Sequence, residues 1–78
     1  MHRFLIVIEK ANTNYSAYSP DLPGCVATGS TRDETEQNML EAIRLHVEGL
    51  EEDGHPIPES SSVAEYLLLP TGTSRSDA

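Results

Sequence analysis

Four glutamates occupy positions from which a sheet and a helix could together hold divalent cations. They are Glu9 near the end of the first predicted strand, Glu36 and Glu48 on the predicted helix, and Glu65 on the last predicted strand. Several such carboxylates can hold two cations for hydrolysis. Nothing in the spacing makes the four converge, and surface acids are the ordinary case. We therefore expect no catalytic residue, no metal site and no cofactor, with a metal-dependent nuclease as an alternative.

The remaining side chains with reactive or metal-binding chemistry are one cysteine and three histidines. Cys25 follows a predicted turn into a strand and has no histidine-containing motif beside it, so we expect a buried structural thiol. A single cysteine also excludes an internal disulfide. His2, His46 and His55 are too scattered in sequence to form a zinc motif. These residues predict no enzyme, which favours a binding function.

The chain is strongly acidic. Its 78 residues include 13 Asp and Glu against 5 Lys and Arg, for a net charge of −8. Eight of these acids lie between Thr31 and Gly54, where only Arg32 and Arg44 oppose them. Binding to a phosphate backbone requires clustered Lys and Arg, so we expect one strongly negative face and no direct nucleic acid partner.

The length predicts one small domain, which we place at residues 1–70, followed by a disordered tail at 71–78. The chain shows neither a basic start with a long apolar stretch nor a run of ~20 apolar residues. We expect a cytoplasmic protein that does not bind a membrane.

Three short segments predict three antiparallel strands. Residues Arg3–Lys10 place apolar side chains on both faces, as in a central strand. A polar turn leads to the second strand, Tyr15–Ser19. Two prolines and a glycine within Pro20–Gly24 predict a sharp turn before the third strand, Cys25–Thr28.

A helix should follow over Arg32–Asp53. Thr31 followed by Glu34 fits a capping box, which satisfies backbone N–H groups that the first turn leaves unpaired. Gly54 suits the end of the helix, and Pro56 prevents its continuation. Apolar residues at helical spacing predict the face that packs on the sheet. These are Met39, Leu40, Ile43, Val47 and Leu50.

An extended linker then leads to a predicted fourth strand, Val63–Leu69, which Pro70 ends. A right-handed crossover would place it beside the first strand, giving an α+β fold with the element order βββαβ and the sheet order 3-2-1-4. One helix covers one face of such a sheet, and the other face also carries apolar side chains. We expect a homo-oligomer, dimer or tetramer, through that face or an edge strand. The alternative is a few tolerated exposed apolar residues.

The order and spacing of several short motifs resemble those of the HicB family of antitoxins, from about Phe4 to Leu69. The residues that carry the resemblance are Tyr18, Asp21-Leu22-Pro23-Gly24-Cys25, Gly29, Thr31, Glu34, Asn38, Glu41-Ala42-Ile43 and Pro56-Ile57-Pro58. The resemblance implies a βββαβ domain like a reduced ribonuclease H fold. It also implies that the domain binds and blocks a small HicA-type toxin that cleaves messenger RNA.

Two features depart from the family pattern. The family often has Ala where this chain has Thr35, a change that we expect to affect only local packing. Full-length members often carry a C-terminal DNA-binding domain, and nothing after Pro70 forms one. We therefore leave open whether the chain regulates its own operon.

Two surfaces are candidates for partner binding. One is the tip of the turn, at Asp21, Leu22 and Pro23, and the other is the charged side of the helix, at Glu41, Leu45, Glu48 and Glu52. An acidic surface would attract a basic toxin and compete with RNA phosphates. Five residues are expected to be structural: Gly24, Cys25, Gly29, Thr31 and Glu34. A stand-alone ligand-binding or regulatory domain stays as an alternative, which a formed apolar pocket would favour.

Overall fold

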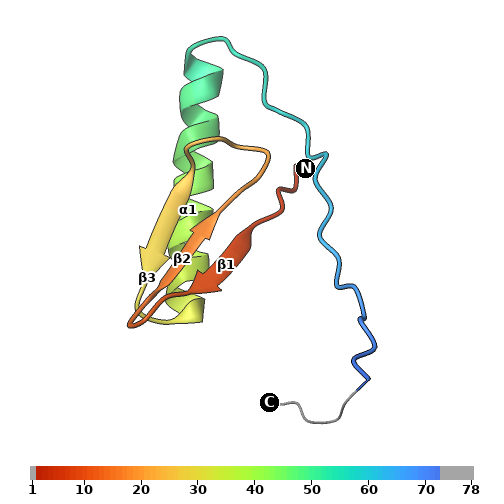
Figure 1. The fold of residues 1–78 in the computed structure, drawn as a ribbon. Coiled ribbons are helices and arrows are strands. Elements are labelled where there is room, and N and C mark those ends of the chain that lie inside the picture. Colours follow the sequence, from red (N-terminus) through yellow and green to blue (C-terminus); the bar gives the residue numbers. More distant parts are fainter. Residues whose placement is uncertain (1, 73–78) are drawn as a thin grey trace.

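The computed structural model of the chain describes residues 2–72, which form a small antiparallel sheet and a helix (Figure 1). The elements are β1 (Val7–Lys10), β2 (Tyr15–Tyr18), β3 (Val26–Gly29) and α1 (Arg32–Glu52). The strands lie in the order β1-β2-β3, and each neighbouring pair is antiparallel. The predicted α+β class and the first four elements are confirmed.

The core lies between α1 and one face of the sheet. Strand register aligns Ile8 with Ala17 and Ala17 with Ala27, and this row faces the helix. The buried core residues are Ala17, Leu22, Cys25 and Met39, with Phe4, Ile6, Ile8, Ala27, Ala42 and Ile43 packed against them. The first predicted strand is expected to carry apolar side chains on both faces. Its even-numbered residues Phe4, Ile6 and Ile8 are the ones that pack against the core.

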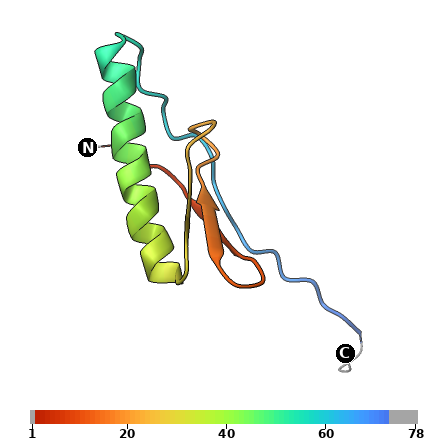
Figure 2. The ribbon, with the colours of Figure 1, turned by 90° about the vertical axis from the view of Figure 1, so that its left-hand side faces the viewer.

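The opposite sheet face has no helix over it in the described part of the chain (Figure 2). Register aligns Val7 with Tyr18 and Tyr18 with Val26 in a row on this face. Tyr18 and Val26 are exposed. One helix thus covers one face, and an apolar row remains on the other.

The start of α1 is capped by side chains. The Thr31 hydroxyl accepts a hydrogen bond from the Glu34 N–H at 3.0 Å, as a capping box requires. The Glu34 carboxylate, however, accepts from the Ser30 N–H at 2.8 Å and the Ser30 hydroxyl at 2.5 Å. The predicted reciprocal cap therefore forms, but it reaches one residue further back than Thr31.

A glycine ends α1. The Gly54 N–H donates to the Glu51 carbonyl at 3.1 Å, and the His55 N–H donates to the Leu50 carbonyl at 2.9 Å. This pair of bonds is a Schellman motif, which needs a left-handed residue at its centre. Gly54 supplies it with a φ of +74°. The predicted end of the helix is confirmed to within one residue, since Asp53 is the C-cap.

The face of α1 that packs on the sheet differs from the predicted stripe at one position. Met39 is fully buried as expected, but Leu40 is 62% exposed, so its assignment to the packing face is wrong. Thr35 is fully buried instead, and its hydroxyl donates to the Thr31 carbonyl at 2.7 Å. That hydrogen bond satisfies the polar group, which explains how threonine is tolerated in the core.

The fourth strand predicted over Val63–Leu69, and with it the order 3-2-1-4, is not formed within this chain. The segment runs past β1 without entering the sheet (Figure 1). Ala64, Glu65 and Tyr66 instead line a cavity of about 750 Å³ together with Ile6, Val7 and Ile8. Among the described strands, β1 has β2 as its ladder partner, and residues 63–69 belong to no ladder. The disordered tail predicted for 71–78 falls mostly outside the described residues.

Candidate partner-binding surface

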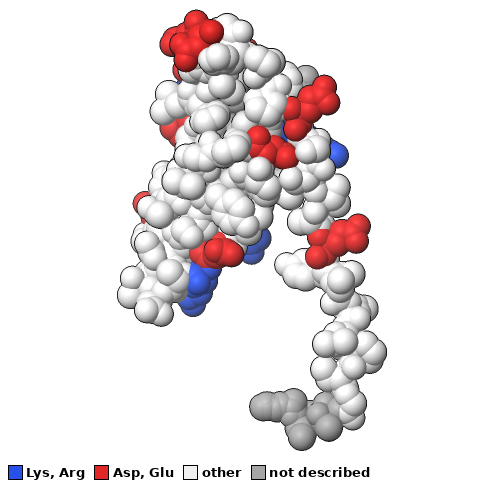
Figure 3. Space-filling model, turned by 45° about the horizontal axis from the view of Figure 1, so that its top comes forward, with Lys and Arg blue, Asp and Glu red and all other residues white. Residues whose placement is uncertain are grey.

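The charged side of α1 is the first candidate surface. Glu41, Leu45, Glu48 and Glu52 are all exposed, and their spacing puts them along one side of the helix. Acidic groups are scattered over the face shown in Figure 3, and most of that face carries no charge. The acidic side of α1 rests on the exposure of Glu41, Glu48 and Glu52.

One arginine lies among these acids. Arg44 donates to the Glu41 carboxylate at 2.5 and 2.7 Å and to Glu48 at 3.3 Å. The hydrogen bonds that Arg44 donates to Glu41, and then the charges of both acids, raise the pKa of Arg44. All three side chains are exposed, so these pairs contribute little to stability. Through these contacts Arg44 holds the Glu41 and Glu48 carboxylates along one side of the helix. Glu52 makes no ion pair with Arg44.

Leu45 lies on this acidic side with 57% of its surface exposed. It is absent from the core cluster. A single exposed leucine is common on protein surfaces. Its place within a charged surface gives a binding partner one apolar contact surrounded by carboxylates.

The turn between β2 and β3 is the second candidate surface. The Leu22 N–H donates to the Ser19 carbonyl and the Cys25 N–H donates to the Leu22 carbonyl, both at 3.1 Å, so two tight turns follow one another. Gly24 has a φ of +83° and so needs its glycine. Leu22 is fully buried in the core, which leaves Pro23 as the exposed apolar residue of the tip.

Asp21 connects this turn to a distant part of the chain. Its carboxylate accepts hydrogen bonds from the linker after α1: from the Ser60 hydroxyl at 3.5 Å, the Ser61 hydroxyl at 3.3 Å, and the Ser62 hydroxyl and N–H at 2.8 and 3.3 Å. The Ser62 hydroxyl is the main cause of the lowered pKa of Asp21. We call this contact the Asp21 tether. It fixes the C-terminal segment against the turn.

The structure brings two of the four candidate metal ligands to one place. Glu36 and Glu65 line the cavity beside β1, but so do Lys10 and Arg32. Within residues 2–72, no group of three or more His, Cys, Asp or Glu side chains comes close enough to hold a metal ion. Burial raises the pKa of the Cys25 thiol, which disfavours the reactive thiolate.

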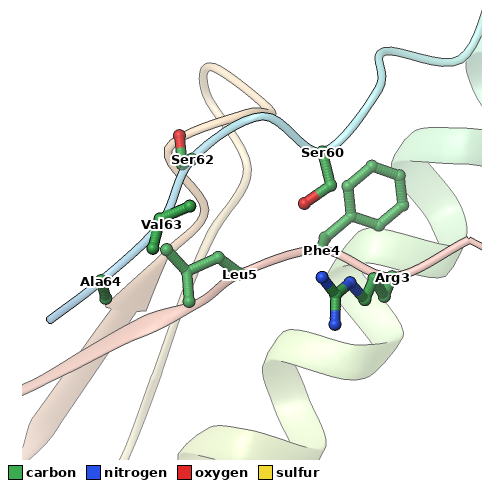
Figure 4. A pocket seen from close by; sticks show the side chains of 7 residues that line it. All are labelled: Arg3, Phe4, Leu5, Ser60, Ser62, Val63 and Ala64. Carbon is green, nitrogen blue, oxygen red and sulfur yellow. The ribbon is translucent and has the colours of Figure 1, made fainter.

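A smaller cavity of about 290 Å³ follows the seam between the N-terminal segment and the tethered linker (Figure 4). Leu5 and Val63 lie close together there, and Phe4 lies beside Ser60. Both walls are short segments that lie outside the sheet ladder. None of the helices in the described range is long and apolar enough to cross a membrane.

The family described as "HicB-like antitoxin of bacterial toxin-antitoxin system" matches residues 4–71 of the chain. The chain belongs to the HicB-like antitoxin family. The match includes the core, the Asp21 tether and the acidic side of α1. It confirms the resemblance drawn from the spacing of the motifs.

Relatives of this HicB-like protein occur in a phage and in bacteria. An uncharacterized 14.9 kDa protein of Haemophilus phage HP1 is 42% identical over 65 residues, 83% of this chain and 49% of the phage protein. The chain thus spans about half the length of that relative. A UPF0150 protein of Synechocystis is 32% identical over 70 residues, which are 88% of this chain and 89% of the relative.

A solved structure of a HicA3 and HicB3 toxin-antitoxin complex contains a chain similar to this one. The TM-score is 0.61 and the sequence identity is 31%, over 76% of this chain and 72% of the other. This chain therefore shares both sequence and fold with one chain of that toxin-antitoxin complex.

Proposed function

We propose that this chain neutralises a small basic HicA-type toxin by covering the surface with which the toxin binds messenger RNA. The observation that carries the proposal is the exposed acidic side of α1, with Leu45 within it, on a HicB-like antitoxin. A toxin that cleaves messenger RNA acts where messenger RNA is found, so a cytoplasmic location accompanies this proposal. The chain itself needs no catalytic activity for this role.

Charge gives the physical basis. An RNA-cleaving protein needs positive charge where it binds phosphates, and Glu41, Glu48 and Glu52 present carboxylates of the opposite sign. Complementary charge of this kind speeds association and selects among partners, while the apolar contact at Leu45 would add affinity after docking. Asp21 and Pro23 extend the proposed surface only if the toxin also reaches the turn.

We also propose that the chain forms a homo-oligomer. The row of Val7, Tyr18 and Val26 leaves apolar surface on the sheet face that α1 does not cover. Apolar surface of this kind on a small domain usually marks an interface.

Charge reversal on α1 tests the toxin-binding surface. We expect Glu48→Lys to weaken binding to a HicA-type toxin at least about tenfold, which corresponds to about 1.4 kcal/mol. Calorimetric titration with a catalytically inactive toxin would measure the change. Glu59→Lys, an equal charge change at an exposed position on the linker, serves as the matched control. Equal affinities for the two variants would remove the acidic side of α1 from the interface.

A further inference from the structure

Residues 63–69 expose more apolar surface than any other described segment. Tyr66 is 100% exposed and Leu68 is 95% exposed, and Val63, Leu67 and Leu69 are at least 80% exposed. The segment is rich in residues that favour strands, and it contains a single charged side chain, Glu65. An apolar strand-like segment left in water needs a sheet edge to cover it.

The same molecule offers such an edge. β1 pairs only with β2 among the described strands, so its other side has unpaired backbone groups. Ile6, Val7 and Ile8 line the cavity on this side. An extended segment that pairs with a free strand edge satisfies both sets of backbone groups.

We propose that residues 63–69 of one copy pair with the β1 edge of a second copy, in a reciprocal exchange that produces a dimer. This inference specifies the surface for the proposed self-association and is independent of toxin binding. Each copy carries both the segment and the edge, so the same two copies can make this contact twice. Both edges are then occupied, and the assembly ends at two chains.

The Asp21 tether fixes the point from which the segment starts. Four hydrogen bonds hold Ser60, Ser61 and Ser62 against the turn. Residues 64–66 pass beside β1, and the chain then continues away from the domain (Figure 2). It therefore reaches outward from a fixed starting point, which suits contact with a second copy.

Charge also permits this dimer. Glu41, Glu48 and Glu52 of α1 are not among the residues that line the cavity beside β1, so exchange at this edge leaves the acidic side of the helix free. Lys10, Arg32 and Glu36 line the cavity on the domain side, and Glu65 lies on the segment. An incoming Glu65 would therefore meet two positive side chains and one negative side chain of the second copy.

Sedimentation equilibrium of the full chain tests the dimer. We expect the wild-type protein to form a dimer, and Leu68→Asp to raise the dissociation constant at least about 100-fold. Leu68 touches little in its own copy, so this variant should still fold. Leu40→Asp, at an exposed leucine on α1 outside the proposed toxin-binding surface, should leave the dimer unchanged. A monomeric wild type would overturn both self-association and exchange, whereas a dimer unaffected by Leu68→Asp would overturn exchange alone.

Hydrogen exchange separates pairing between copies from pairing within one copy. Amide protection of residues 63–69 should increase with protein concentration as the dimer forms. Protection that is the same at all concentrations would show that the segment pairs within its own chain, and would contradict the proposal.

Discussion

At the residue scale, Gly29 shows how closely α1 approaches the sheet. A Cβ at this position would lie 2.6 Å from the Thr35 hydroxyl oxygen and 2.8 Å from the Thr35 backbone nitrogen. The backbone nitrogen is held in the first turn of α1 by its bond to the Thr31 carbonyl at 2.9 Å, so it has little freedom to move. Glycine at 29 and threonine at 35 are therefore a coupled pair.

We expect Gly29→Ala to lower the free energy of unfolding by about 1–3 kcal/mol through overpacking. Urea denaturation followed by circular dichroism would measure the loss. Gly49→Ala is the matched control, because a Cβ there meets no atom within 4 Å and alanine favours the helix. Equal stability of the two variants would refute the close approach at Gly29.

Asp21 gives a pH-dependent contact at the same scale. Its pKa is lowered from 3.8 in the folded chain, mainly by the Ser62 hydroxyl, so the ionised form stabilises the tether. That stabilisation is complete above about pH 3.8 and is lost as the pH falls through the lower folded pKa. The Ser62 amide resonance should titrate with a midpoint below 3.8, and Asp21→Asn should abolish the transition. A midpoint at or above 3.8 would contradict the tether.

At the element scale, local chemistry predicts most of the fold. Thr31, Glu34 and Gly54 place both ends of α1 because caps act within a few residues. The apolar pattern and the turn residues together predict all three strands. The predicted Arg3–Lys10 is longer than β1 because an apolar pattern alone does not show where a ladder begins.

Contacts between distant residues account for the errors. Asp21 binds serines about 40 positions away, so no local pattern could identify them as its partners. Leu22 was a candidate contact because it lies in a polar turn, yet the two tight turns direct it into the core. The predicted fourth strand at residues 63–69 failed for the same reason. Its position depends on the Asp21 tether, which joins residues far apart in the sequence. The exposed acids and Leu45 were predictable because helical periodicity alone determines their side of α1.

At the scale of the whole molecule, the two proposed interfaces lie on different parts of the fold. The acidic side of α1 is available for a basic toxin, while the β1 edge and residues 63–69 are available for a second copy. A dimer joined at the edge would present two acidic helices. One dimer would then bind two toxin molecules, and Leu68→Asp would lower the size of the complex without changing the ratio of the two chains.

Inhibition of RNA cleavage tests the central claim most directly. The toxin to use is the small basic protein encoded next to this chain. Its cleavage of a defined messenger RNA would be measured as this chain is added in increasing amounts. We predict that cleavage ceases near one antitoxin chain per toxin, and that Glu48→Lys shifts the titration to higher concentration while Glu59→Lys does not. Undiminished cleavage in excess wild-type chain would contradict the account.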